Sequence, residues 1–91
     1  MSLGGPTDAI LNKAVNAAVA TGVVVVVAAG NALEDACGYS PASATQAITV
    51  GAIESFLDMQ SFYSNFGTCL DVWAPGSQII STDRNGNCDS Y

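Results

Sequence analysis

The stretch Val23-Val24-Val25-Val26-Val27-Ala28-Ala29-Gly30-Asn31 decides the fold of this chain. Five consecutive valines without polar alternation predict a strand buried on both faces, as in the centre of a parallel sheet covered by helices. Three small residues and an amide then follow at the carboxyl end of the strand, where open α/β sheets place their ligand crevices. Because a Gly-Asn pair alone is more typical of a turn, other parts of the chain must decide between a turn and a site.

The segment before the valines predicts a second strand and a helix. Ser2-Leu3-Gly4-Gly5 is expected to end a short strand, and a helix is expected from Pro6-Thr7-Asp8 to about Thr21, with Gly22 as its stop. Helical spacing predicts a buried face of Ile10, Leu11, Ala14, Val15, Ala18 and Val19, and a solvated face of Asn12, Lys13 and Asn16. A right-handed strand-helix-strand unit would make the two strands parallel, so that residues 2–5 and 28–31 form two walls of one crevice.

Shorter strands are expected further along the chain, at residues 46–52, 69–76 and 77–81. Glu34 and Asp35 lie in the long loop after the valine strand, and adjacent carboxylates in a loop favour a solvated surface over an acid/base pair. Residues 83–91 are polar and predict a loose or truncated tail.

Length and composition indicate a slice of a larger domain. The chain has 91 residues, of which 49% are hydrophobic and only 11% charged, so it is short for a sheet with helices on both faces. The net charge of -6, with Lys13 and Arg84 as the only cations, argues against nucleic acid and against an anionic membrane surface. No apolar run is long enough for a membrane span, and the first residues do not predict a secretory signal.

The three cysteines predict a disulfide and one remaining thiol. The sequence contains no histidine, and a zinc site would then need all three cysteines and a carboxylate. A disulfide would place the protein outside the cytosol.

Six short signatures follow one another in a fixed order: Ser-Leu-Gly-Gly at 2–5, Val-Val-Ala-Ala-Gly-Asn at 26–31, Tyr-Ser-Pro-Ala at 39–42, Thr-Val-Gly-Ala at 49–52, Ser-Asn-Phe-Gly at 64–67 and Trp-Ala-Pro-Gly at 73–76. In this order and with these gaps they resemble the subtilisin-like serine proteases, most closely the proteinase K branch. The resemblance implies an α/β fold, a portion of a three-layer domain with a mainly parallel sheet. Residues 1–82 would be the central part of the peptidase domain, and residues 83–91 would lie outside the resemblance.

The resemblance also implies roles for residues in both walls of the crevice. Asn31 matches the oxyanion-hole asparagine, whose amide donates a hydrogen bond to the tetrahedral intermediate. Ser2, Leu3 and Gly4 match the strand that pairs with the substrate backbone, while Ala28, Ala29 and Gly30 match a wall of the primary specificity pocket.

Two further features are implied by the resemblance. A structural calcium ion would bind to Asp71 and to the backbone carbonyls of Thr45 and Ala47, although Thr45 replaces a proline of the family and Tyr63 resembles an insertion. Cys37 and Cys69 match a disulfide pair, whereas Cys88 matches no known position.

The resemblance places this chain between the catalytic histidine and the catalytic serine of a Ser-His-Asp enzyme. The chain contains no histidine and no Gly-Thr-Ser-Met-Ala signature, so we expect it to be inactive alone. The parent protein would be a secreted serine endopeptidase that acts on peptides or proteins, with the remainder of the peptidase domain as partner. The alternative is a truncated, non-catalytic homologue that at most binds extended peptides along residues 2–4.

Overall fold

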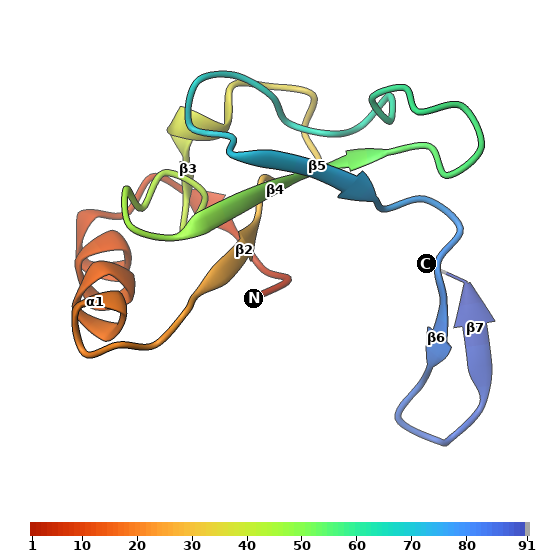
Figure 1. The fold of residues 1–91 in the computed structure, drawn as a ribbon, viewed down its shortest axis with the longest axis horizontal. Coiled ribbons are helices and arrows are strands. Elements are labelled where there is room, and N and C mark those ends of the chain that lie inside the picture. Colours follow the sequence, from red (N-terminus) through yellow and green to blue (C-terminus); the bar gives the residue numbers. More distant parts are fainter. Residues whose placement is uncertain (91) are drawn as a thin grey trace.

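The computed structural model describes residues 1–90. Figure 1 shows a helix on one side, parallel strands across the middle and a separate hairpin on the other side. The elements in chain order are β1 (Gly5–Pro6), α1 (Ala9–Ala20), β2 (Val26–Ala28), the 3-10 helix η1 (Ala36–Gly38), β3 (Tyr39–Ser40), β4 (Ile48–Ile53), β5 (Val72–Pro75), β6 (Ile80–Thr82) and β7 (Cys88–Ser90). No helix in this part of the chain is long and apolar enough to cross a membrane.

The central sheet has the strand order β2-β4-β5, and all its strands are parallel. Val27 lies opposite Thr49, and Gly51 lies opposite Trp73. The α/β class and the parallel sheet predicted from the sequence are therefore confirmed. Because the strands are parallel, their carboxyl ends lie at one edge of the sheet, where the loops after β2, β4 and β5 meet.

The valine strand is shorter and less buried than predicted. It forms β2 over Val26–Ala28, and β2 lies at an edge of the three-stranded sheet rather than at its centre. Val25 and Val27 pack towards Val15 of α1, whereas Val24 is 75% and Val26 45% exposed. Since α1 packs on one face only, alternate valines face solvent on the other.

The helix begins and ends as predicted, but its buried face is narrower. Asp8 caps α1 by accepting hydrogen bonds from the amides of Ile10 and Leu11, and Gly22 follows the last turn with a φ of +96°. Ile10, predicted to be buried, is 82% exposed. Asn12 and Asn16, predicted to face solvent, instead bind the turn before β4 through the Ser43 hydroxyl and the Gln46 amide.

The first residues pair with β2 without forming a strand of their own. The amide of Ala28 donates to the carbonyl of Met1, and the Met1 amino group donates to the carbonyl of Val26. This is the pattern of a parallel bridge, so the chain runs beside β2 before it enters β1, which pairs with β3. The predicted strand at residues 2–5 is therefore absent as such: residues 2–4 lie outside any strand, and only the pairing of Met1 with β2 agrees with the predicted parallel arrangement.

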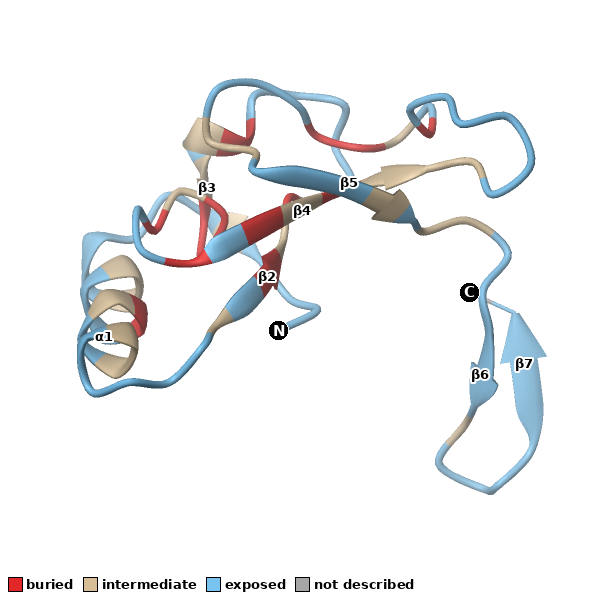
Figure 2. Cartoon of the chain, viewed as in Figure 1, coloured by how far each residue is buried: buried red, intermediate tan, exposed pale blue. Residues whose placement is uncertain are grey.

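The predicted loose or truncated tail, residues 83–91, is not loose over its described part, because residues 80–90 form a hairpin and residue 91 lies outside the described residues. β6 and β7 pair in an antiparallel ladder around a turn that Asp83 holds by accepting from the amides of Asn85 and Asn87. These backbone hydrogen bonds, led by the one from Asn87, lower the pKa of Asp83. Figure 2 shows that both strands are exposed and that buried residues gather instead around β2, β4 and the loops beside them.

Candidate functional site

A pocket of about 280 Å³ lies at the carboxyl end of β2. We call it the strand-end pocket, and it is lined by residues 2–4 and 28–32 together with Tyr39, Ser40 and Ala42. Both walls that the sequence predicted, Ser2-Leu3-Gly4 on one side and Ala28-Ala29-Gly30 on the other, therefore border the same hollow. Asn31 lies on its rim.

The walls are fixed by backbone hydrogen bonds. Ala28 binds Met1 on one side, and the Ala29 amide donates to the carbonyl of Val50 in β4 on the other, at 2.9 Å. Gly4 lies close to β3, because a Cβ on it would come within 3.4 Å of the Ser40 carbonyl oxygen. Small residues in both walls leave the hollow between them open.

Asn31 follows a sharp change in chain direction. Gly30 has a φ of +106°, which favours glycine, and the chain then leaves β2 towards the loop that ends in η1. The Asn31 side chain is exposed, and within residues 1–90 its amide forms no hydrogen bond with the chain. An amide in this position is available to donate to a ligand oxygen in the pocket.

The segment 61–66 holds the loop after β2 in place. Leu33 donates to the carbonyl of Tyr63, Phe66 donates to that of Glu34, and Ala36 donates to that of Phe66. The Asn65 side chain, fully buried, binds the same loop. Asn65 belongs to the Ser-Asn-Phe-Gly signature at 64–67, but nothing in its sequence context predicts this role.

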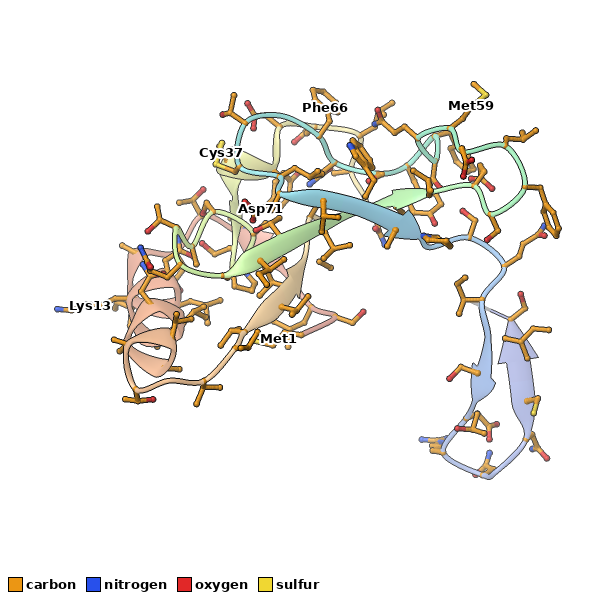
Figure 3. The ribbon with its side chains drawn as sticks, viewed as in Figure 1. Met1, Lys13, Cys37, Met59, Phe66 and Asp71 are labelled. Carbon is orange, nitrogen blue, oxygen red and sulfur yellow. A yellow bond between two sulfur atoms is a disulfide. The ribbon has the colours of Figure 1, made fainter. Side chains whose placement is uncertain are left out.

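A disulfide joins Cys37 and Cys69, with a Cα–Cα distance of 5.3 Å, and this is the pair that the resemblance implied. It connects η1 to the loop before β5, near Phe66 (Figure 3). Cys88 is the free and exposed cysteine.

The prediction that Glu34 and Asp35 do not form an acid/base pair agrees with the structure, because each carboxylate binds a different group. Asp35 accepts from the Cys37 amide and caps η1, whereas Glu34 accepts from the Tyr39 hydroxyl at 2.6 Å. The hydrogen bond to Glu34 raises the pKa of Tyr39. Both carboxylates therefore have local structural partners.

A second pocket, of about 870 Å³, opens on the sheet at the ends of β2, β4 and β5 and shares Asn31 with the strand-end pocket. The Ser77 hydroxyl in its lining lies 2.9 Å from the Tyr63 hydroxyl and donates to Glu54 at 2.8 Å. The aromatic spacing at 62–66 predicts packing and gives no signal for this polar network. No motif marks it, because Glu54 and Tyr63 lie in the loop between β4 and β5 and Ser77 lies in the loop between β5 and β6.

Asp71 lies just before β5 and is labelled in Figure 3. One of its carboxylate oxygens accepts from the Thr49 amide at 2.7 Å, and its own amide donates to the Thr49 carbonyl at 2.9 Å. No cluster of three or more acidic, cysteine or histidine side chains occurs within residues 1–90. A metal at Asp71 would thus have one carboxylate and would otherwise depend on carbonyl oxygens and water, which suit calcium.

Comparison with known proteins identifies relatives over nearly the whole chain. The model of the subtilase family, Peptidase_S8, matches residues 1–91. Subtilisin-like serine protease Pen ch 18 of Penicillium rubens is 54% identical over 82 residues, which are 90% of this chain and 16% of that protein. Subtilisin-like serine protease Rho m 2.0101 of Rhodotorula mucilaginosa is also 54% identical over 82 residues, which are 90% of this chain and 24% of that protein.

A solved structure has the same fold. The crystal structure of a cold adapted subtilisin-like serine proteinase matches with a TM-score of 0.96 and 44% sequence identity. The match covers 99% of this chain and 33% of that protein. The chain therefore corresponds to about a third of the length of the matched structure, and to less of the two fungal relatives.

Proposed function

Because this chain belongs to the subtilase family, we propose that it forms the central part of a subtilisin-like serine endopeptidase and supplies its oxyanion donor and substrate-binding walls. The single observation that carries this proposal is the strand-end pocket, which brings Asn31 together with residues 2–4 and 28–30. The substrates would be peptides or proteins, and the partner would be the rest of the peptidase domain.

The proposed chemistry follows from the groups at the pocket. When a serine oxygen attacks a peptide carbonyl, negative charge develops on the carbonyl oxygen, and a preorganised amide donor lowers the energy of this state. The Asn31 amide is such a donor. The backbone of residues 2–4 would pair with the substrate main chain, and the small residues 28–30 would leave room for a substrate side chain.

The chain cannot supply the remaining chemistry. Nucleophilic catalysis of this type needs a base beside the serine, and the sequence has no histidine. Residues outside this chain would complete the site.

The test uses a hybrid peptidase, in which this chain replaces the matching third of the cold adapted proteinase. We expect the hybrid to hydrolyse peptide substrates and to react with a fluorophosphonate, and we expect the 91-residue chain alone to do neither. A hybrid that is folded by circular dichroism yet inactive would contradict the proposed function. Labelling of the chain alone would contradict the claim that it lacks a nucleophile and base.

We further propose that Asp71, with the carbonyls of Thr45 and Ala47, binds a structural calcium ion. The free oxygen of Asp71 and two carbonyls are hard donors, and one carboxylate predicts weak binding, with a Kd of about 10⁻⁴–10⁻³ M. At 10–100 times Kd, calcium should stabilise the hybrid by about 1.4–2.7 kcal/mol. Asp71→Asn keeps an acceptor for the Thr49 amide but removes the charge, so it should abolish this gain.

Thermal unfolding of the hybrid in calcium and in a chelator measures this gain in the free energy of unfolding. Asp58→Asn, at an exposed aspartate of another loop, is the control and should retain the full gain. An equal response to calcium in Asp71→Asn would show that the ion binds elsewhere.

We propose an extracellular location for the protein. The Cys37–Cys69 disulfide supports it, since disulfides persist in oxidising compartments and are rare in the cytosol.

A further inference from the structure

Asn65 makes an unusual set of contacts with the loop that carries Asn31. Its side-chain amide donates to the carbonyl of Ala29 at 3.0 Å, and its side-chain oxygen accepts from the amides of Ala32 at 2.9 Å and Glu34 at 3.0 Å. Its backbone amide donates to the carbonyl of Gly30 at 2.9 Å. One residue thus binds the chain on both sides of Asn31.

The side chain of Asn65 also fills the space inside the turn. It is 0% exposed, and a Cβ placed on Gly30 would lie 2.5 Å from its amide nitrogen. Gly30 therefore adopts its φ of +106° around the Asn65 side chain. The shape of the turn and the position of Asn65 depend on each other.

Asn65 is itself fixed by the end of β4. The Ser64 hydroxyl accepts from the amide of Ala52 at 2.9 Å and donates to the carbonyl of Asn65 at 3.0 Å, while the Ser61 amide donates to the Ala52 carbonyl. Ser61 and Ser64 are buried as well. This chain of contacts runs from the central sheet through Asn65 to the Asn31 turn.

We propose that Asn65 is a positioning residue, which holds the Asn31 amide in the geometry that stabilises the oxyanion. The inference rests on the proposed function of Asn31 and extends it to a residue that touches no substrate. Oxyanion donors act only when they are oriented before the reaction, and a misplacement of about 1 Å can lower a rate on the order of 10²-fold. The Asn31 side chain is exposed and forms no hydrogen bond within residues 1–90, so it does not fix its own orientation. Asn65 fixes the backbone on both sides of Asn31 instead.

Asn65→Ala in the hybrid peptidase should lower kcat on the order of 10²-fold with little change in KM, because transition-state binding and not substrate binding depends on the donor. If Asn65 acts through Asn31, the double variant Asn31→Leu/Asn65→Ala should be no slower than Asn31→Leu alone. Rates are expressed per active site, counted by complete fluorophosphonate titration. Unfolded molecules are thereby left out of kcat.

The matched control is Asn16→Ala, because the Asn16 side chain also accepts from a backbone amide, that of Gln46, but lies on α1. Asn16→Ala should leave kcat unchanged. In the double variant Asn31→Leu/Asn16→Ala, kcat should fall by the product of the two single factors, that is, by the factor for Asn31→Leu alone. Two results would overturn the positioning role while Asn31→Leu still shows the oxyanion role. One is a double variant Asn31→Leu/Asn65→Ala that is slower than Asn31→Leu by the full factor measured for Asn65→Ala alone. The other is an Asn65→Ala variant with the kcat of the parent hybrid. If Asn31→Leu itself has no effect, the proposed function fails first, and the inference fails with it.

A second measurement covers the case in which Asn65→Ala is too unstable for kinetics. Gly30→Ala disturbs the same contact from the other side, since its Cβ would displace the Asn65 amide, and it should also lower kcat with little change in KM. Hydrogen exchange at Ala32 and Glu34 in these hybrids should be faster than in the parent hybrid, because both amides lose a buried acceptor. Unchanged protection in both variants would overturn the inference.

Discussion

Replacing Asn31 by leucine in the hybrid peptidase should lower kcat by about 10²–10³-fold and leave KM nearly unchanged. The magnitude is that known for removing the corresponding amide donor from subtilisin and is taken over from that enzyme. Leucine has a similar volume but no donor, and the Asn31 side chain is exposed, so the substitution should not disturb folding. Steady-state kinetics on a peptide substrate, with active sites titrated, measures the effect.

Asn85→Leu provides the control for this substitution. Asn85 is an exposed asparagine in the turn between β6 and β7, where the amide that Asp83 binds belongs to the backbone. This variant should keep the parent kcat. If Asn31→Leu raises KM and leaves kcat intact, Asn31 binds substrate in its ground state, and the oxyanion role is wrong.

Removing the disulfide by Cys37→Ala and Cys69→Ala should lower the free energy of unfolding by about 3–4 kcal/mol. The two cysteines are separated by 32 residues, and closing a loop of this length restricts the unfolded chain by about that amount in the chain-entropy model. Urea unfolding of the fluorophosphonate-inhibited hybrid, followed by circular dichroism, measures the loss without autolysis.

Cys88→Ser is the control for the disulfide, because Cys88 is free and exposed on β7. It should change the free energy of unfolding by less than about 0.5 kcal/mol. Equal losses in both variants, or none in the double alanine variant, would contradict a stabilising bond between residues 37 and 69.

The sequence predicted the elements of the fold well where local signals are strong. Asp8 and Gly22 mark the ends of α1, and the strand predicted at 46–52 corresponds to β4 at Ile48–Ile53. The valine run predicts more burial than the structure has, because five β-branched residues indicate a strand but do not say how many layers cover it. Val25 and Val27 pack with Val15 of α1, whereas Val24 and Val26 are exposed.

The candidate site could be predicted only in part. Strand direction and the βαβ order brought residues 2–4 and 28–31 together, since parallel strands end at one edge. Asn65 could not be found in this way. Its role depends on contacts between residues more than 30 positions apart. The residue type alone does not distinguish an asparagine with a buried, hydrogen-bonded side chain from one in an exposed turn.

The hairpin of β6 and β7 carries a cysteine that is suited to site-specific labelling. Its strands project away from the sheet and α1, and Cys88 is the only cysteine outside the disulfide (Figure 1). A maleimide dye would therefore attach at a single known position on this chain, on a ribbon that does not line the strand-end pocket. Fluorescence from that dye could report on docking of the chain with the rest of its domain, without a label near Asn31.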